Sequence, residues 1–321
     1  MNVPHRNLQA SGNDRQSIEH GSDELVSITS VLRRPTYDIL LQLKAEADSE
    51  GNQNAQLISA LEDNDRQSGL YEGGLKTWEG ALDLASLIDQ IDFAGSGGGW
   101  HIVELGAGSA IPSLVALKQV LASRRQVELE SQRTQFRFTL SDYNDEVLRL
   151  STWANVLLAT RQELDHRKGA PSTNVEESLE MSEGLARECL NLWQEVGISF
   201  SFISGPWGKE FEGRATRSST ESCTDYPTTL QHPNLLILAS ETIYDLQSLP
   251  AFTDTVINLL RQHRGDSRAW IAAKKLYFGV GGGVDAFVQE VENRGGAVRE
   301  IMNITQGVGR VVLEVTMSKE R

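Results

Sequence analysis

The sequence has few cysteines and no long apolar run. Cys189 and Cys223 are the only cysteines among 321 residues, which is too few for a disulfide framework, and they lack metal-ligand spacing. The longest apolar stretch lies around residues 235–239, far short of the roughly 20 residues that a membrane helix requires. These absences predict a reducing compartment and no membrane-spanning segment.

Paired histidines and basic runs are also missing. None of the six histidines forms an H-x-x-H or H-x-x-x-H pair, so we expect no metal site. The 44 acidic side chains outnumber the 30 basic ones, the formal net charge is −14, and no run of five Lys or Arg occurs. We therefore expect no direct nucleic-acid binding. Residues 1–24 carry no apolar secretory core, so we expect a protein of the cytoplasm and nucleus.

Composition divides the chain into three parts. Residues 1–24 are polar and predict a disordered tail, because they cannot bury enough apolar surface to offset the entropy of ordering. Residues 25–64 predict an N-terminal helical extension, with apolar residues partly at helical spacing. Residues 65–321 form the main domain. Within it, residues 161–183 and 209–233 are polar and predict surface insertions.

The main domain alternates between strand and helix patterns. A helix is expected after Thr77, with Trp78, Ala81, Leu82, Ala85 and Ile88 on one face. Seven strands are expected at residues 101–105, 136–140, 198–203, 235–240, 269–274, 298–304 and 311–316. Further helices are expected at residues 111–122, 146–158, 249–264 and 284–293, and around Leu185, Cys189, Leu192, Trp193 and Val196. This order predicts an α/β fold: a Rossmann-like, seven-stranded, mostly parallel sheet with helices on both faces. Because only residues 306–309 join the last two strands, the final strand should be antiparallel.

A glycine turn follows the first predicted strand of the main domain. Gly106, Ala107 and Gly108 lie between that strand and a helix that begins near Ile111. Glycines there let the backbone approach a ligand closely, and the helix offers free N–H groups. Ile111 stands where a dinucleotide site has its third glycine, which disfavours a pyrophosphate cradle. A tight turn with nothing bound remains the alternative.

A carboxylate ends the next predicted strand. Asp142 can accept both ribose hydroxyls of an adenosine ligand, and Tyr143 beside it can lie on the adenine. The simpler explanation is that Asp142 caps the helix that follows.

Several segments together resemble a known family. They are the glycine turn, residues 69–79 (Gly-Leu-Tyr-Glu-Gly-Gly-Leu-Lys-Thr-Trp-Glu), Asp142-Tyr143-Asn144, Gly205-Pro206-Trp207, residues 240–244 (Ser-Glu-Thr-Ile-Tyr), Lys274 and residues 277–283. In this order they resemble the S-adenosylmethionine-dependent class I methyltransferases, and among them the protein-histidine N-methyltransferases. The resemblance spans about residues 65–316. It implies S-adenosyl-L-methionine as cofactor and a protein substrate, a large-subunit ribosomal protein.

The resemblance also assigns site residues. Around the cofactor it places Thr77, Trp78, Glu79, Gly106, Ala107, Gly108, Asp142, Tyr143, Asn144, Gly205, Trp207 and Ser240. Glu241 and Tyr244 belong to an acid-x-x-aromatic motif that faces the substrate, and they are the expected catalytic residues. Ala110 stands where the family usually has a glycine. Core packing remains an alternative for Trp78 and Tyr244.

Methyl transfer from a sulfonium is an in-line displacement, so positioning and the exclusion of water dominate catalysis. A histidine acceptor, with a pKa of about 6.5, needs a fixed tautomer rather than a strong base. We expect Glu241 or a nearby backbone carbonyl to fix it. A related protein-lysine methyltransferase and a non-catalytic S-adenosylmethionine-binding subunit stay open, and Ala110 favours the second. The missing third glycine disfavours a dehydrogenase. We expect a monomer.

Overall fold

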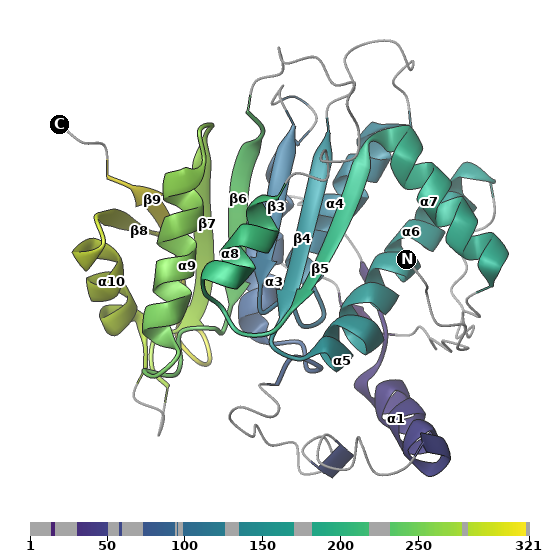
Figure 1. Ribbon diagram of the computed structural model, residues 1–321, viewed down its shortest axis with the longest axis horizontal. Coiled ribbons are helices and arrows are strands. Elements are labelled where there is room, and N and C mark those ends of the chain that lie inside the picture. The colour runs from purple at the N-terminus through teal and green to yellow at the C-terminus, as the bar shows by residue number, and fades with distance from the viewer. Residues whose placement is uncertain are drawn as a thin grey trace.

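A seven-stranded sheet forms the centre of the protein, whose structure is a computed structural model (Figure 1). Its strands are β3 (Trp100–Leu105), β4 (Phe136–Asp142), β5 (Ile198–Ser204), β6 (Asn234–Ser240), β7 (Ser267–Lys274), β8 (Gly296–Ile304) and β9 (Arg310–Met317). Their order is β5-β4-β3-β6-β7-β9-β8. Neighbours from β5 to β7 are parallel, whereas β9 is antiparallel to both β7 and β8. The predicted fold class is confirmed, including the antiparallel last strand.

The structure describes residues 14–16, 31–50, 58–59, 73–93, 95, 99–125, 135–169, 182–217, 232–277 and 282–318. No helix within these ranges is both long enough and apolar enough to cross a membrane.

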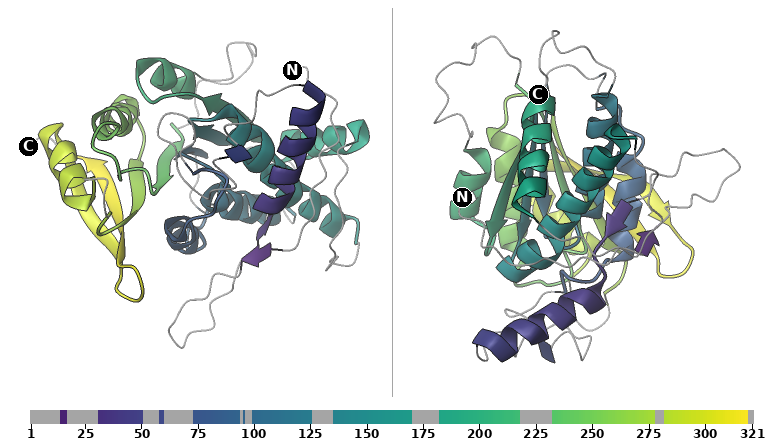
Figure 2. Two further views of the ribbon diagram at one scale, coloured as in Figure 1. Left: turned by 90° about the horizontal axis from the view of Figure 1, so that it is seen from below. Right: turned by 90° about the vertical axis from the view of Figure 1, so that its right-hand side faces the viewer.

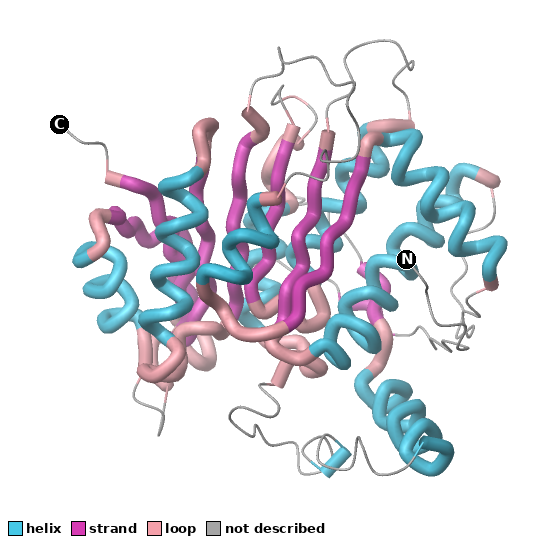
Figure 3. The backbone as a smooth tube through the Cα atoms, in the orientation of Figure 1, coloured by secondary structure: helices cyan, strands magenta, loops and turns pink. Residues whose placement is uncertain are grey.

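Helices cover both faces of the sheet (Figures 1 and 3). One face carries α3 (Glu79–Ile88), α4 (Ile111–Ser123), α6 (Trp153–Arg167) and α7 (Glu183–Val196). The other carries α8 (Lys209–Thr216), α9 (Leu249–Gln262) and α10 (Val284–Asn293). Side chains alternate along each strand, so Ile102 joins the first apolar core and Val103 the second. Because both faces are covered, apolar residues point to both sides of the central strand β6, in the run Leu235 to Ala239.

The strand order reverses beside β3, because the chain runs from β3 to β4 on one side and later returns to β6 on the other. In open α/β sheets, ligands bind outside the carboxyl ends of the strands at such a point. The glycine turn leaves β3 at this place.

Helix α7 follows the sequence pattern closely. All five apolar residues that the pattern placed on one face are buried: Leu185, Cys189, Leu192, Trp193 and Val196. Ser182 caps the helix by accepting from the Leu185 N–H at 3.2 Å, and Gly197 ends it in the left-handed region.

The helix expected over residues 146–158 is interrupted. It consists of α5 (Asp145–Val147), a π-helical turn η2 (Leu148–Thr152) and the start of α6. Thr152 Oγ1 donates to the Gly108 carbonyl at 2.6 Å and lies 3.4 Å from the Val147 carbonyl. We attribute the extra residue of the π-helical segment to the hydrogen bond with Gly108, because that bond requires the Thr152 side chain to point toward residues 106–108.

Both expected insertions begin with helix. Residues 161–167 continue α6, where Arg167 pairs with Glu163. Residues 209–216 form α8, with Phe211 and Ala215 buried in the second core. These two apolar side chains are enough to pack α8 against the second core. The segment is otherwise polar, and for that reason we predicted a surface insertion. Residues 170–181 and 218–231 lie outside the described residues.

The structure describes only three residues of the expected N-terminal tail. Within residues 1–24, β1 (Asp14–Gln16) pairs antiparallel with β2 (Val31–Arg33). The rest of that segment lies outside the described residues. The expected helical extension contains α1 (Thr36–Glu50), which lies below α5 in Figure 1 and along the bottom of the right-hand view of Figure 2.

Candidate functional site

The glycine turn is a tight left-handed structure. Gly106 has φ +67° and Gly108 has φ +53°, a region that favours glycine. A Cβ on Gly108 would lie 2.7 Å from the Gly74 carbonyl oxygen. Ala110 also has a positive φ, +57°, where the family usually has glycine. The turn therefore depends on a close approach between backbone segments, which leaves no room for a Cβ on Gly108.

Asp142 holds this turn from the end of β4. Its side chain is 6% exposed, and Oδ2 accepts from the Gly108 N–H at 3.0 Å. Oδ1 accepts from the Asn144 N–H at 3.2 Å. Asn144, not Asp142, is the N-cap of α5, so the capping explanation for Asp142 is wrong. The carboxylate lies between the loops that follow β3 and β4.

Residues 73–78, which we call the cover segment, lie against the glycine turn. Thr77 Oγ1 and Ser109 Oγ share a hydrogen bond of 2.9 Å. Trp78 Nε1 donates to the Gly73 carbonyl at 3.2 Å, and the amino groups of two lysines, Lys76 and Lys274, each lie 4.9 Å from the centre of the Trp78 ring. Trp78 precedes α3 and is only half-buried, which disfavours plain core packing. Residues 69–72 of the same motif lie outside the described residues.

Two buried polar residues support the turn from α6 and the π turn. Thr152 bonds the Gly108 carbonyl, and Asn155 Nδ2 donates to the Ser109 carbonyl at 2.9 Å. Both side chains are 0% exposed. Our sequence reasoning missed them, although two polar residues within an apolar helical pattern were the available signal.

Glu241 directly follows β6, with φ +55°. Its Oε2 accepts from the Tyr277 hydroxyl at 2.6 Å, and the same hydroxyl accepts from the Lys274 N–H at 3.1 Å. Glu241 Oε1 is buried and has no partner within the described part of the chain. Burial raises the pKa of Glu241, while the Tyr277 bond and the Lys274 charge act against that shift.

Residues that follow β7 contact the loop that follows β6. The Gly282 N–H donates to the Tyr244 carbonyl at 3.0 Å, and a Cβ on Gly282 would lie 2.3 Å from Tyr244 backbone atoms. The rings of Tyr244 and Tyr277 are 6.2 Å apart, edge to face. Glu241 and Tyr244 are thus both held by the loop that contains Tyr277, a residue our candidate set omitted.

The other expected residues divide into two groups. Tyr143 is 45% exposed beside Asp142, and the Gly205 N–H donates to the Asp142 carbonyl at 3.1 Å. Ser240 ends β6, and Glu79 begins α3 as an exposed residue. These lie at the same sheet edge as the glycine turn, where Ala107 N–H donates to the Ser141 carbonyl at 2.7 Å.

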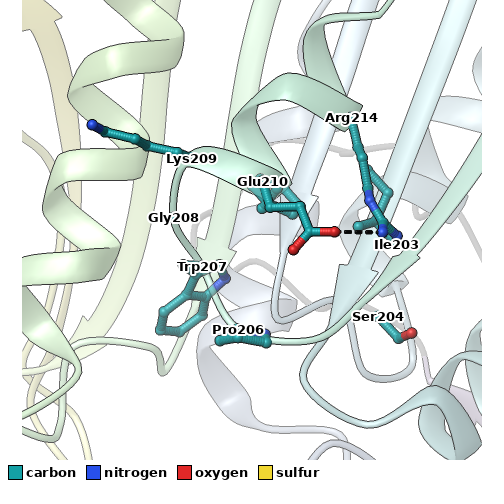
Figure 4. Close-up of a pocket in the computed structure, with 9 residues that line it drawn as sticks. Ile203, Ser204, Pro206, Trp207, Gly208, Lys209, Glu210 and Arg214 are labelled. Atoms are coloured by element: carbon teal, nitrogen blue, oxygen red, sulfur yellow. Dashed lines mark hydrogen bonds and ion pairs between the residues drawn. The ribbon is translucent and has the colours of Figure 1, made fainter.

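Trp207 lies apart from this group. Its ring packs edge to face on Phe252 of α9, with the ring centres 5.0 Å apart. It also lines a pocket of about 240 Å³ between the end of β5 and α8 (Figure 4). Lys209, Glu210 and Arg214 line the same pocket, with Glu210 and Arg214 paired at 2.6 Å. The Gly205-Pro206 turn leads the chain toward α9, so the contact expected between Trp207 and the cofactor stays a prediction.

Comparison with known proteins assigns the family. No family model matches the chain. Histidine protein methyltransferase 1 of Schizosaccharomyces pombe is 33% identical over 291 residues, which cover 88% of this chain and 76% of that protein. The protein of the same name from Saccharomyces cerevisiae is 30% identical over 279 residues, 82% of this chain and 69% of that one. The chain belongs to the histidine protein methyltransferase family.

Solved structures add nothing to this assignment. The structure of an rRNA methyltransferase from Streptomyces viridochromogenes is 16% identical in sequence and has a TM-score of 0.37. The match covers 83% of this chain and 93% of the chain in that structure. The family assignment confirms the resemblance found in the motifs and, with it, a methyltransferase that uses S-adenosylmethionine.

The residues present fit this cofactor. A Cβ on Gly106 would lie 3.0 Å from Thr242 and one on Gly108 would lie 2.7 Å from the Gly74 carbonyl oxygen, so the turn keeps bare backbone here. Asp142 presents a buried carboxylate beside it. Backbone N–H groups, a ribose-binding acid and an exposed aromatic, Tyr143, are the groups that an adenosine ligand needs.

Replacing Gly108 by alanine should abolish cofactor binding. The new Cβ would meet the Gly74 carbonyl at 2.7 Å, and its φ of +53° would add strain. Calorimetric titration with S-adenosylmethionine measures the effect. Gly213→Ala in α8 is the matched control, because nothing lies within 4 Å of its Cβ position. Equal affinity in the two variants would contradict the placement of the cofactor.

Glu104 in β3 predicts a pH dependence of stability. It is 2% exposed, its Oε2 accepts from the Ser113 N–H at 3.2 Å and from the Ser113 hydroxyl, and burial raises its pKa to about 8. The folded protein then holds a proton that the unfolded chain loses near its ordinary value of 4.5. The free energy of unfolding should therefore fall as the pH rises from about 4.5 to about 8.

Glu104→Gln should remove this contribution while its carbonyl still accepts from Ser113. Urea unfolding across that pH range measures it: the unaltered protein should lose more stability toward high pH than the variant. Parallel curves would show that Glu104 does not hold the proton.

Proposed function

We propose that this protein transfers a methyl group from S-adenosylmethionine to a ring nitrogen of a histidine in a large-subunit ribosomal protein. The observation that carries the proposal is that motif segments far apart in sequence meet at one edge of the sheet. The cover segment, the glycine turn, Asp142 and residues 240–244 all lie around the point where the strand order reverses. The names of the relatives favour histidine over lysine as acceptor.

On the cofactor side, each group has a separate role. Asp142 would bind the ribose hydroxyls, the glycine turn would face the amino-acid end through backbone N–H groups, and Tyr143 would lie on the adenine. Thr77 and Trp78 would cover the site and exclude water. The bound cofactor supplies an electrophilic methyl group on sulfur, so the protein has only to align the acceptor nitrogen with it.

On the acceptor side, Glu241 is the candidate for fixing the imidazole tautomer. Tyr277 occupies one carboxylate oxygen, and Oε1 is buried beside Gly80 of α3 without a hydrogen-bond partner in the described part of the chain. The Glu241 side chain would turn away from Gly80 for Oε1 to accept the N–H of the non-reacting ring nitrogen. That bond leaves the lone pair of the other nitrogen toward the methyl group. A backbone carbonyl near Glu241 remains the alternative acceptor, and Tyr244, held by Gly282, would flank the ring.

Glu241→Gln tests this role. Its carbonyl oxygen can still accept from Tyr277, but its amide nitrogen cannot accept an imidazole N–H. We expect turnover to fall by about 10-fold or more with unchanged cofactor affinity, on the scale of losing a hydrogen bond to a charged group. Full turnover in the variant would exclude Glu241 and leave the backbone carbonyl.

The substrate and the setting are part of the proposal. The scarcity of cysteine supports a reducing compartment, and we propose the cytoplasm and nucleus, where ribosomal proteins are made and assembled. We also propose that the protein acts as a monomer.

A labelled transfer experiment tests the function. The purified protein is incubated with radiolabelled S-adenosylmethionine and ribosomal proteins from cells that lack it, and the product is hydrolysed to amino acids. We expect label in methylhistidine. Label in methyllysine would identify lysine as the acceptor and assign the protein to the related protein-lysine methyltransferases. Measurable cofactor binding without any labelled product would favour the non-catalytic subunit.

Asp142→Ala is the control for the transfer experiment. Losing the hydrogen bonds of a charged group should weaken cofactor binding by about 1.5–3 kcal/mol, so labelling at limiting cofactor should be lost. Labelling unchanged by this substitution would contradict the assigned site.

A further inference from the structure

The N-terminal helix α1 packs against the loops of the cofactor site. Ile39 and Leu43 of α1 are fully buried in a small apolar cluster of their own. The other buried members are Leu75 of the cover segment, Val147 of α5 and Leu150 of the π turn. This cluster is separate from the two cores of the sheet. The α1 helix therefore contacts the elements that surround Asp142 and not the faces of the sheet.

Arg34 joins this segment to the π turn. The side chain is 3% exposed. Its Nη1 donates to the Leu150 carbonyl at 3.3 Å, and its Nη2 donates to Gln42 Oε1 at 2.7 Å and to the Asp38 carbonyl at 3.3 Å. A charge buried this far is tolerated only when it is hydrogen-bonded, and these bonds reach both α1 and the π turn.

The same residue connects to the glycine turn through its backbone. The Arg34 N–H donates to Asn155 Oδ1 at 2.7 Å, and the Asn155 amide nitrogen donates to the Ser109 carbonyl at 2.9 Å. Asn155 is 0% exposed, so solvent water cannot replace either hydrogen bond of its side-chain amide. The position of Arg34 thereby fixes the amide that supports the glycine turn.

A second link reaches the other side of the site. Thr36 Oγ1 donates to the Leu75 carbonyl at 3.1 Å. Leu75 follows Gly74, and the Gly74 carbonyl lies close to the backbone of Gly108. The start of α1 therefore bonds the cover segment, while Arg34 bonds the support beneath the glycine turn.

We propose that residues 31–46 form the outer wall of the cofactor site and that Arg34 is the positioning residue that sets the spacing between the cover segment and the glycine turn. The inference rests on the proposed use of the cofactor, and it assigns the N-terminal extension to the binding site. Arg34 touches no reacting atom. Its guanidinium acts through Leu150 and α1, whereas its backbone N–H, which a side-chain substitution keeps, bonds Asn155.

Arg34→Met tests the proposal, because methionine keeps an apolar stem and removes every donor of the guanidinium. Calorimetry with S-adenosylhomocysteine, well below the melting temperature of each variant, measures binding to fully folded protein. We expect about a 10-fold rise in Kd, because the glycine turn and the cover segment would lose the spacing that the guanidinium sets without any contact to the ligand itself. A purely structural role would lower the melting temperature and leave the Kd unchanged, and that result would overturn the proposal.

Arg167→Met is the matched control. Arg167 is also partly buried and paired, with Glu163 and Glu195, but it lies 12 residues beyond Asn155 on α6, about 18 Å along the helix. We expect a lower melting temperature with a Kd within about twofold of the unaltered protein. An equal rise in Kd in both arginine variants would reduce the effect to general destabilisation and overturn the role of Arg34.

Two further variants cover the case in which Arg34→Met does not fold. Arg34→Lys keeps the charge and should show an intermediate Kd, because an ammonium cannot match all three acceptors. Thr36→Val removes only the bond to Leu75 and should raise the Kd by a few-fold; unchanged affinity in both would overturn the proposal. If the unaltered protein bound no S-adenosylhomocysteine, the proposed function itself would be wrong. Normal binding in every variant would refute only the proposal that residues 31–46 form part of the cofactor site.

Discussion

The site depends on one close backbone contact, that of Gly108 with the Gly74 carbonyl. Neither side tolerates a Cβ: one on Gly108 would lie 2.7 Å from the carbonyl oxygen, and one on Gly74 would lie 3.0 Å from Asp142 Oδ2. Asp142 adds the bond to the Gly108 N–H that holds the left-handed turn. Because backbone atoms meet here without intervening side chains, small displacements of the cover segment change the space left for a ligand.

Buried polar groups maintain that contact, and each of them is costly unless it is bonded. Thr152 and Asn155 hold the carbonyls of the turn, Ser113 bonds the Glu104 carboxyl under it, and Arg34 holds the π turn from outside. Such a network loses stability when one member is removed, because the partner is left unsatisfied. The same property makes its geometry well defined, which a reaction governed by alignment requires.

The two groups of residues at the carboxyl ends of the strands are built differently. Around the glycine turn, close backbone contacts combine with the buried Asp142 carboxylate, the half-buried Trp78 and the exposed Tyr143. Around Glu241, the Tyr277 hydroxyl bonds the carboxylate, and the Gly282 N–H bonds the Tyr244 carbonyl. In the function we propose, the first group would bind the cofactor. The second would orient the acceptor ring, since residues that follow β7 hold both Glu241 and Tyr244.

Local patterns were enough to predict the sheet, most of the helices and the motif residues. Strand alternation, the glycine turn and the amphipathic face of α7 all depend on neighbours along the chain. Contacts between distant segments established four further features: α8 docks within a polar stretch, a π turn interrupts residues 146–158, Trp207 packs on Phe252, and Arg34 bonds Leu150 and Asn155. These contacts join residues far apart in sequence, and their polar or isolated side chains carry no periodic signal, so packing alone establishes them.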